Sequence, residues 1–345
     1  MSQDEGFEKK LPEEKSFPVG KHFPEVTFFP LEKILPLHIR ESLTEISWQE
    51  GLEEIRVRVG QPMEFFYGEG SRYLGIENGT CVFIMEQERW QGRDLYLMNM
   101  QDIGEMMSYI SNYSLYAYKE EIRQGYITIE GGHRVGLAGG VATEQGKLTG
   151  ICHVSFLNIR IAHERRDCAG EILPYIRQKG KIYSTLLFSE PGAGKTTFLR
   201  DCIRLLSTGT REEPGAKVCV VDERSEIAAC HLGIPQNDLG PRTDVLDGAG
   251  KADGMLMLLR SMSPQVLAVD ELGGEADFAA VEQAVYAGCR VIGTVHAGSV
   301  EELARKPYLH RWVEQQVFQR YIGITRDLNG KRSIQVFDAG LELLC

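Results

Sequence analysis

A glycine-rich segment near the middle of the chain constrains the fold more than any other feature. It has the sequence Ser-Glu-Pro-Gly-Ala-Gly-Lys-Thr-Thr over residues 189–197, follows the apolar run STLLF and leads into the helical pattern TTFLRDCIRLLS. A strand, a glycine loop and a helix in this order are the context of a phosphate-binding loop. A glycine turn with a chance lysine is the alternative, and the flanking strand and helix disfavour it.

The residue types in this loop suit a nucleoside triphosphate. Glycines let backbone N–H groups approach phosphate oxygens, and the N-terminus of the following helix adds its positive end. Lys195 is placed to neutralise the β- and γ-phosphates, and Thr196 to offer its hydroxyl to magnesium. The usual pattern begins with Gly where this chain has Ser189, but the phosphate-facing part from Gly192 to Thr196 is intact. We expect ATP and Mg²⁺ as ligands, with the nucleotide bound by Glu190, Pro191, Gly192, Ala193, Gly194, Lys195, Thr196 and Thr197.

The second half of the chain alternates apolar strands with helices. The strand patterns are KVCVVDE, PQVLAVDE and CRVIGTVHA, and the helical patterns are KADGMLMLLRSM and DFAAVEQAVYAG. Continuous apolar strands separated by helices indicate a parallel sheet with helices on both faces. We predict the α/β class: a RecA-like P-loop NTPase domain with a central, mostly parallel sheet, preceded by a smaller α+β N-terminal domain.

The first half has a different pattern. EEIRVRVGQPMEFFY predicts two strands joined by a Gly-Gln-Pro turn, and residues 126–162 predict a β-meander divided by glycine turns. Gln101–Tyr113 has helical spacing, with Asp102 as its expected N-cap. We predict a tail over residues 1–30, an α+β domain over 31–167, and an ATPase domain with a short C-terminal extension over 168–345.

Two carboxylates follow the apolar strand Val266–Val269. Parallel strands present such acids at their carboxyl ends, which is the edge where a P-loop also lies. Asp270 would support the magnesium shell through water, and Glu271 would polarise the attacking water as general base. An apolar run followed by Asp-Glu is common and usually structural. Here its position downstream of the P-loop favours the catalytic interpretation.

Two further segments end strands with polar residues. One is Asp222–Glu226, with the sequence DERSE, and the other ends at His296 in GTVHA. A single histidine after a strand is usually a surface or packed residue. His296 ends the strand that follows the one carrying Glu271, and a neutral imidazole can donate one hydrogen bond and accept another. We therefore expect His296 to sense the γ-phosphate.

Bulk composition limits the partners and the compartment. The net charge is −11 and the isoelectric point about 5.4, which speaks against a broad basic surface for nucleic acid. The eight cysteines form no Cys-x-x-Cys pair, which favours buried reduced thiols in the cytoplasm. No signal peptide and no apolar run near the roughly 20 residues of a membrane span are found. Membrane contact is therefore expected only through partner proteins.

Together these segments resemble the secretion-ATPase superfamily, the hexameric motors of type II and type IV secretion and of pilus retraction. Asp222–Glu226 resembles that family's Asp box, Glu271–Glu275 its Walker B motif, and Thr294–His296 its His box. Gly274 replaces a frequently charged residue of the Walker B motif. The resemblance implies a homo-hexamer and catalytic roles for Lys195, Glu223, Glu271 and His296.

A closer resemblance is to the stage III sporulation AA family of endospore-forming bacteria. It covers about Leu31 to Thr325 and rests on EEIRVRVGQP, NYSLYAYKEEIRQGYITIEGGHRVGLAG, SFLNIRIA, PRTDVLDGAGKADGMLMLLRSMSPQVLAVDELGG and GTVHA. It implies a cytoplasmic ATPase of the mother cell that energises a channel to the forespore. The implied partners are membrane proteins of that channel, so the chain would lie peripherally at the membrane.

An ATPase site between subunits needs a cation from the neighbouring subunit, because charge on the transferred phosphoryl group must be stabilised. Arg134 and Arg160 are similar in placement to the interdomain arginines of secretion ATPases, and we take them as candidate arginine fingers. Arg224, Arg242 and Arg260 are rivals within the ATPase domain. A surface or salt-bridge role is the alternative for each.

Three functions compete. The first is a secretion-type motor. The second is a nucleic-acid-dependent translocase or helicase, which the acidic charge and the lack of a KH or OB signature disfavour. The third is a regulatory switch that binds ATP without significant hydrolysis. Glu271 argues against the switch, because a protein that only binds ATP needs no base there.

Overall fold

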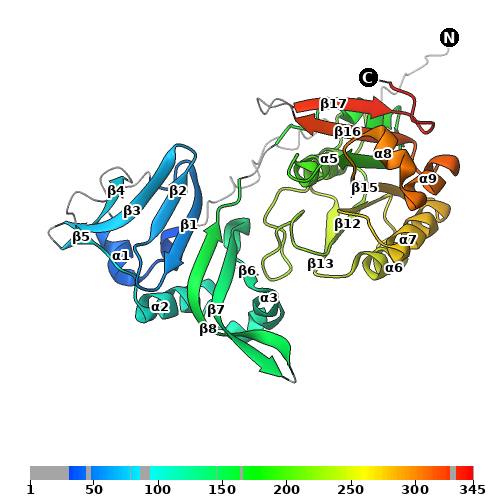
Figure 1. The fold of residues 1–345 in the computed structure, drawn as a ribbon. Helices are drawn as coiled ribbons and strands as arrows, with labels where there is room; N and C mark the ends of the chain where they lie inside the picture. The colour runs from blue at the N-terminus through cyan, green and yellow to red at the C-terminus, as the bar shows by residue number, and fades with distance from the viewer. Residues whose placement is uncertain are drawn as a thin grey trace, which may run out of the picture.

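The chain builds two β-sheets, each with its own helices (Figure 1). The computed structural model describes residues 31–43, 48–77, 79–85, 94–144, 146–163, 166–326 and 332–344. The tail predicted over residues 1–30 lies outside the described residues.

The first sheet is antiparallel, with strand order β4-β3-β2-β1-β8-β7-β6 and with β5 paired to β3. The predicted strand–turn–strand is confirmed as β1 and β2, and the predicted meander as β6, β7 and β8. The elements of this half are η1 (Leu31–Ile34), α1 (Leu37–Ser42), β1 (Leu52–Arg58), β2 (Glu64–Tyr67), β3 (Gly70–Glu77), β4 (Thr80–Met85), β5 (Asp94–Leu95), α2 (Met100–Ile110), η3 (Leu115–Tyr118), α3 (Lys119–Gln124), β6 (Tyr126–Thr128), η4 (Glu130–Gly132), β7 (Arg134–Glu144) and β8 (Lys147–Arg160).

Apolar side chains of α1, α2 and the strands form the core of this half. The prediction that Asp102 is the N-cap of the helix is wrong. Asn99 is the N-cap, and its side chain accepts from the backbone N–H groups of Gln101 and Asp102. Asp102 instead accepts from the N–H of Asn99 and completes a capping box, since it stands three residues into the helix.

The second sheet has the order β13-β12-β14-β15-β11-β16-β17 and is parallel except for the final hairpin of β16 and β17. The remaining elements are α4 (Leu173–Ile176), β9 (Arg177–Gln178), β10 (Lys181–Ile182), β11 (Thr185–Ser189), α5 (Lys195–Thr208), β12 (Val218–Asp222), β13 (Thr243–Asp247), α6 (Lys251–Ser261), β14 (Val266–Val269), α7 (Glu275–Tyr286), β15 (Arg290–His296), α8 (Val300–Arg305), α9 (Pro307–Glu314), β16 (Arg320–Arg326) and β17 (Arg332–Phe337).

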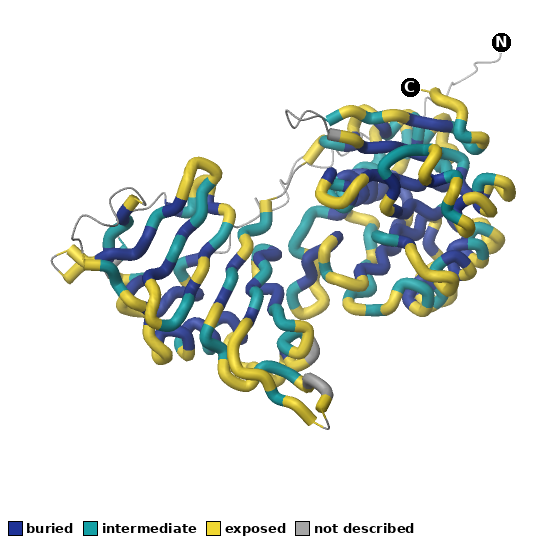
Figure 2. Tube along the Cα trace, in the orientation of Figure 1, coloured by how far each residue is buried: buried dark blue, intermediate teal, exposed yellow. Residues whose placement is uncertain are grey.

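Both faces of the second sheet are covered, as predicted. Alternate strand residues pack against α6, α7 and α9 on one face and against α4 and α5 on the other. Strands β11, β12 and β14 are buried at every residue, which is why their sequences are continuously apolar (Figure 2). The predicted α/β class with a mostly parallel sheet is confirmed.

The two halves meet through a small set of polar and aromatic contacts. Arg134 of β7 pairs with Glu226 at 3.2 Å. The His231 ring stacks on Tyr118 with a centroid distance of 6.1 Å, and His231 Nδ1 donates to the carbonyl of Thr128 at 3.1 Å. These contacts place the first sheet against the segment that follows β12.

Within the described part of the chain, no helix combines the length and apolar character needed to cross a bilayer. The seven described cysteines are unpaired. Cys81, Cys202, Cys219, Cys230 and Cys289 are buried and Cys168 is half-buried, whereas Cys152 on β8 is exposed.

Candidate nucleotide site

The glycine loop lies between β11 and α5, in the context expected for a P-loop. β11 ends at Ser189 and α5 begins at Lys195. Gly192 and Gly194 have φ angles of 78° and 97°, a backbone region that residues with a Cβ rarely adopt. Gly194 is the N-cap of α5, so the free N–H groups of the first helical turn face the end of the loop.

Lys195 is almost completely buried, with 5 % exposure. Its ammonium donates to the carbonyls of Ser189 and Glu190 and to the Ser189 hydroxyl, each at 3.1 Å. It also lies 3.0 Å from Nδ1 of His296. Burial lowers the pKa of Lys195. The Ser that replaces the usual Gly thus supplies two acceptors to this lysine.

Thr196, at the start of α5, is joined to the end of β14. Its hydroxyl donates to Oδ2 of Asp270 at 2.6 Å. The other carboxylate oxygen of Asp270 accepts from the hydroxyl of Thr294, a fully buried residue of β15. Thr294 Oγ1 in turn accepts from the N–H of Glu271 at 2.8 Å. Side chains of two other elements, α5 and β15, therefore fix the two acids that follow β14.

Glu271 lies at the centre of a chain of polar contacts. Its Oε1 is 3.1 Å from Nε2 of His296, and its Oε2 accepts from Arg224 Nη1 at 2.6 Å. An ammonium can only donate, so Nδ1 of a neutral His296 accepts from Lys195 and Nε2 carries the proton toward Glu271. Glu271 has a φ angle of 51°, an uncommon conformation for a residue other than glycine.

The acidic segment after β12 forms a tight turn around Asp222. The Asp222 carboxylate is buried and accepts from the N–H groups of Glu226, Ile227 and Ala228 at 2.7–3.0 Å. Burial raises the pKa of Asp222 to about 6, and these three hydrogen bonds oppose the rise. Glu223 pairs with Lys251 of α6. A small cleft beside the turn is lined by Val221, Asp222, Glu223, Arg224, Glu226, Lys251, Asp270 and Glu271.

The candidate arginines lie in different environments. Arg134 pairs with Glu226 of the acidic turn, and its guanidinium lies 3.6 Å from the Tyr126 ring centroid. Arg160 stands opposite Arg134 in the antiparallel register, is exposed, and has no ion-pair partner within the described part of the chain. Arg242 donates to the Gly215 carbonyl, and Arg260 lies near the C-terminal end of α6. Of the rivals, only Arg224 contacts Glu271.

The strand order explains why these residues meet. β12, β14, β15 and β11 are consecutive neighbours and parallel, so their carboxyl ends share one edge of the sheet. Asp222 and His296 are the last residues of β12 and β15, and Asp270 and the P-loop directly follow β14 and β11. The sequence did not predict two contacts of the site: that of Thr294 with Asp270, and that of the Ser189 hydroxyl with Lys195. A hydroxyl residue two positions before His296 was visible, but its target depended on which strands are neighbours.

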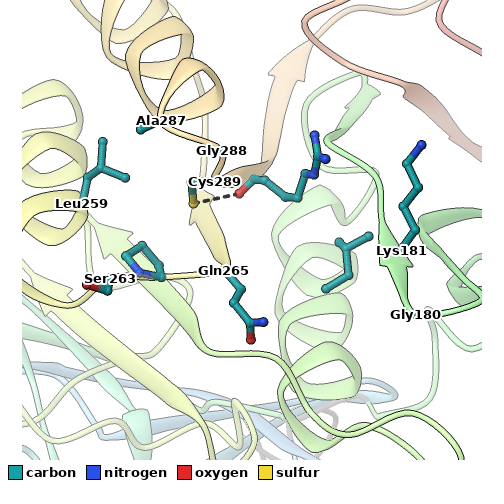
Figure 3. A pocket seen from close by; sticks show the side chains of 11 residues that line it. Gly180, Lys181, Leu259, Ser263, Gln265, Ala287, Gly288 and Cys289 are labelled. Atoms are coloured by element: carbon teal, nitrogen blue, oxygen red, sulfur yellow. Dashed lines mark hydrogen bonds between the residues drawn. The ribbon is translucent and has the colours of Figure 1, made fainter.

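A cavity of about 540 Å³ lies at the opposite edge of the same sheet (Figure 3). It is bounded by the ends of α6 and α7 and by β10, with Leu259, Ala287 and Lys181 among its lining. The thiol of Cys289 donates to the Arg290 carbonyl, and burial raises the pKa of this thiol to about 12. The cavity holds none of the residues predicted to bind phosphate and lies apart from the candidate nucleotide site.

The chain is similar to known proteins of one family. The family model described as "Sporulation stage III, protein AA" matches residues 30–339. Stage III sporulation protein AA of Bacillus subtilis (strain 168) is 40 % identical over 310 residues, which cover 89 % of this chain and 94 % of the relative.

Two solved structures are similar in fold at low sequence identity. The Legionella pneumophila ATPase DotB has a TM-score of 0.50 at 15 % identity, covering 84 % of this chain and 77 % of DotB. The pilus retraction motor PilT with bound ADP has a TM-score of 0.51 at 14 % identity, covering 86 % of this chain and 80 % of PilT. At these identities the likeness shows a shared fold and no more. The 310-residue match and the family model together show that this chain belongs to the sporulation stage III protein AA family.

Proposed function

We propose that the chain is an Mg²⁺-dependent ATPase that converts ATP to ADP and phosphate and acts as a motor of the secretion-ATPase type. One observation carries the proposal. Hydrogen bonds join Lys195 to His296, His296 to Glu271, and Thr196 to Asp270 at a single edge of the sheet. A lysine, a hydroxyl, two acids and an imidazole in this arrangement match the parts that phosphoryl transfer requires.

Each residue has a role in this proposal. The loop of residues 190–197 holds the phosphates, and Lys195 exchanges its carbonyl acceptors for phosphate oxygens. Glu271 polarises the attacking water, and His296 donates a hydrogen bond to the γ-phosphate. Glu223, on the neighbouring acidic turn, supports the water from the other side of the cleft.

Thr196 at the start of α5 and Asp270 after β14 would suit a magnesium ion. Mg²⁺ prefers hard oxygen ligands, and the Thr196 hydroxyl and the Asp270 carboxylate are held 2.6 Å apart. When bound, the ion neutralises charge that develops on the β- and γ-phosphates. Thr196 is the direct protein ligand in this proposal, and Asp270 orients the ion's water shell.

The chain's domains, its oligomeric state and its cellular location are also part of this proposal. We divide the chain into an N-terminal domain over 31–167 and an ATPase domain over 168–345, and propose a homo-hexamer in which Arg134 or Arg160 reaches a neighbouring site. The relative's name links that protein to stage III of sporulation. This supports a role in that stage of sporulation. We further propose that the motor acts in the mother-cell cytoplasm and energises a channel to the forespore through membrane proteins of that channel.

The test compares ATP turnover of the purified wild type with that of Glu271→Gln, with and without Mg²⁺, and records oligomeric mass with ATP. Glu212→Gln is the matched control, because Glu212 is exposed in the loop after α5. We expect Mg²⁺-dependent turnover that Glu271→Gln lowers by about 10²-fold or more while ATP still binds. Wild type that binds ATP, turns over no faster than the variant and stays monomeric would instead support the regulatory switch.

A further inference from the structure

Both oxygens of the Glu271 carboxylate are engaged by side chains from other elements. Oε2 accepts from Arg224 at 2.6 Å, a distance typical of a strong charge-assisted hydrogen bond. Oε1 faces the N–H of His296 at 3.1 Å. The Arg224 side chain is 61 % exposed and that of Glu271 30 %, so the pair is open to rearrangement. A donor on a carboxylate oxygen lowers its basicity toward water, and here each oxygen already has one.

The two donors to Glu271, His296 and Arg224, differ in how ATP binding would affect them. His296 is joined through Nδ1 to Lys195, the residue that phosphate attracts. Nucleotide binding therefore acts directly on the His296 side of Glu271. Arg224 has no such connection, because it reaches Glu271 from the acidic turn after β12. Something other than the P-loop lysine must move Arg224.

The acidic turn connects Arg224 to the first sheet. Asp222 holds the backbone of the turn through three hydrogen bonds, so the turn moves as a unit. Two residues after Arg224, Glu226 pairs with Arg134 of β7 at 3.2 Å. Arg200 of α5 donates to the carbonyls of Glu226 and Ile227 at 2.7 Å. A displacement of β7 relative to the second sheet therefore acts on a rigid turn that carries Arg224.

We propose that Arg224 is a positioning residue that restrains Glu271 in the resting protein, and that movement of the first sheet through Arg134 and Glu226 releases it. This inference rests on the proposed ATPase function and adds a control of that same site. The first sheet would set the rate of hydrolysis by withdrawing a cation from the base. Arg134 then acts within its own chain, which leaves Arg160 as the candidate arginine finger.

The test measures kcat and KM for ATP of the full chain in wild type, Arg224→Ala and Arg224→Lys. Because an exposed ion pair is weak, we expect Arg224→Ala to raise kcat by roughly threefold to fivefold with KM unchanged. Lysine keeps the cation and should restore the wild-type rate. Glu226→Gln weakens the contact with Arg134 through which the first sheet acts while leaving the backbone of the turn in place. Glu271 should then stay restrained, and kcat should stay at or below the wild-type value. Arg211→Ala is the control, an exposed arginine in the loop after α5.

The outcomes separate this inference from the proposed function. An active wild type with an equally active Arg224→Ala overturns the restraint alone. A fall in kcat for Arg224→Ala also overturns it and assigns Arg224 to the transition state. Wild type and Arg224→Ala that both bind ATP and both fail to hydrolyse it overturn the ATPase function and the restraint together. A wild type that is inactive beside an active Arg224→Ala supports both.

Discussion

Lys195 shows how a buried cation is kept for a ligand. The ammonium is almost fully removed from water, and three oxygens and one imidazole nitrogen surround it. Burial lowers its pKa, so the fold holds this charge at a cost in free energy. Such a cost is common at residues whose partner is a substrate.

Replacing Lys195 with Met should separate binding from stability. Methionine fills a similar volume without a charge, so we expect nucleotide binding to be lost. The free energy of unfolding should stay level or rise by up to about 1 kcal/mol, because a desolvated ammonium is removed. Binding of a fluorescent ATP analogue and urea denaturation measure the two quantities. A large fall in stability would mean that the lysine mainly serves the loop structure.

A glycine lies inside helix α2 and another inside helix α6, and the two have opposite effects on packing. A Cβ at Gly254 of α6 would lie 2.6 Å from Cγ1 of Val221, so the helix can approach β12 only without a side chain there. A Cβ at Gly104 of α2 would have no neighbouring atom within 4 Å. The same residue type is therefore required by packing in one helix and not in the other.

We expect Gly254→Ala to destabilise the protein by about 1–3 kcal/mol, because overpacking outweighs the better helix propensity of alanine. Gly104→Ala should stabilise it by roughly 0.5–1 kcal/mol, since only propensity and unfolded-state entropy change. Chemical denaturation of the two variants beside wild type measures both effects. Equal effects of the same sign would contradict the packing explanation.

Sequence patterns predicted the strands and helices better than the side-chain contacts between them. Strands β12, β14 and β15 were predictable because each is a continuous apolar run that leads into polar residues. The pairing of Thr294 with Asp270 was not, because it depends on β14 and β15 being neighbours in the sheet. Asp102 was mistaken for the N-cap because both ends of a capping box are acidic or amide residues. Propensity does not distinguish these two positions.

Acidic residues face each other where the two sheets meet. Glu121 of α3 has its pKa raised to about 7, first by burial and then by the charge of Asp247 at the end of β13. Burial also raises the pKa of Asp247. A protonated Glu121 therefore favours the observed arrangement, and its ionisation opposes it.

The sign of the pH effect follows from the raised pKa. The stability that a protonated Glu121 contributes is fully present below about pH 4.5 and is lost as pH rises through about 7. Because Glu121 is partly exposed, we expect only about 1 kcal/mol of unfolding free energy to be lost between pH 5 and pH 8. Glu121→Gln should flatten this dependence, as measured by urea denaturation at each pH. An unchanged pH profile in Glu121→Gln would exclude this carboxyl as its source.

The distribution of thiols has a practical consequence for following the two sheets in solution. Burial raises the pKa of the Cys168 thiol to about 11 and of the Cys230 and Cys289 thiols to about 12, and these groups react slowly. Cys152 is the exposed thiol among the described cysteines, and it stands on β8, the strand that also carries Arg160. The native chain therefore offers a reactive position on the first sheet for a fluorophore, from which energy transfer to a labelled nucleotide would report the separation of the two halves during turnover.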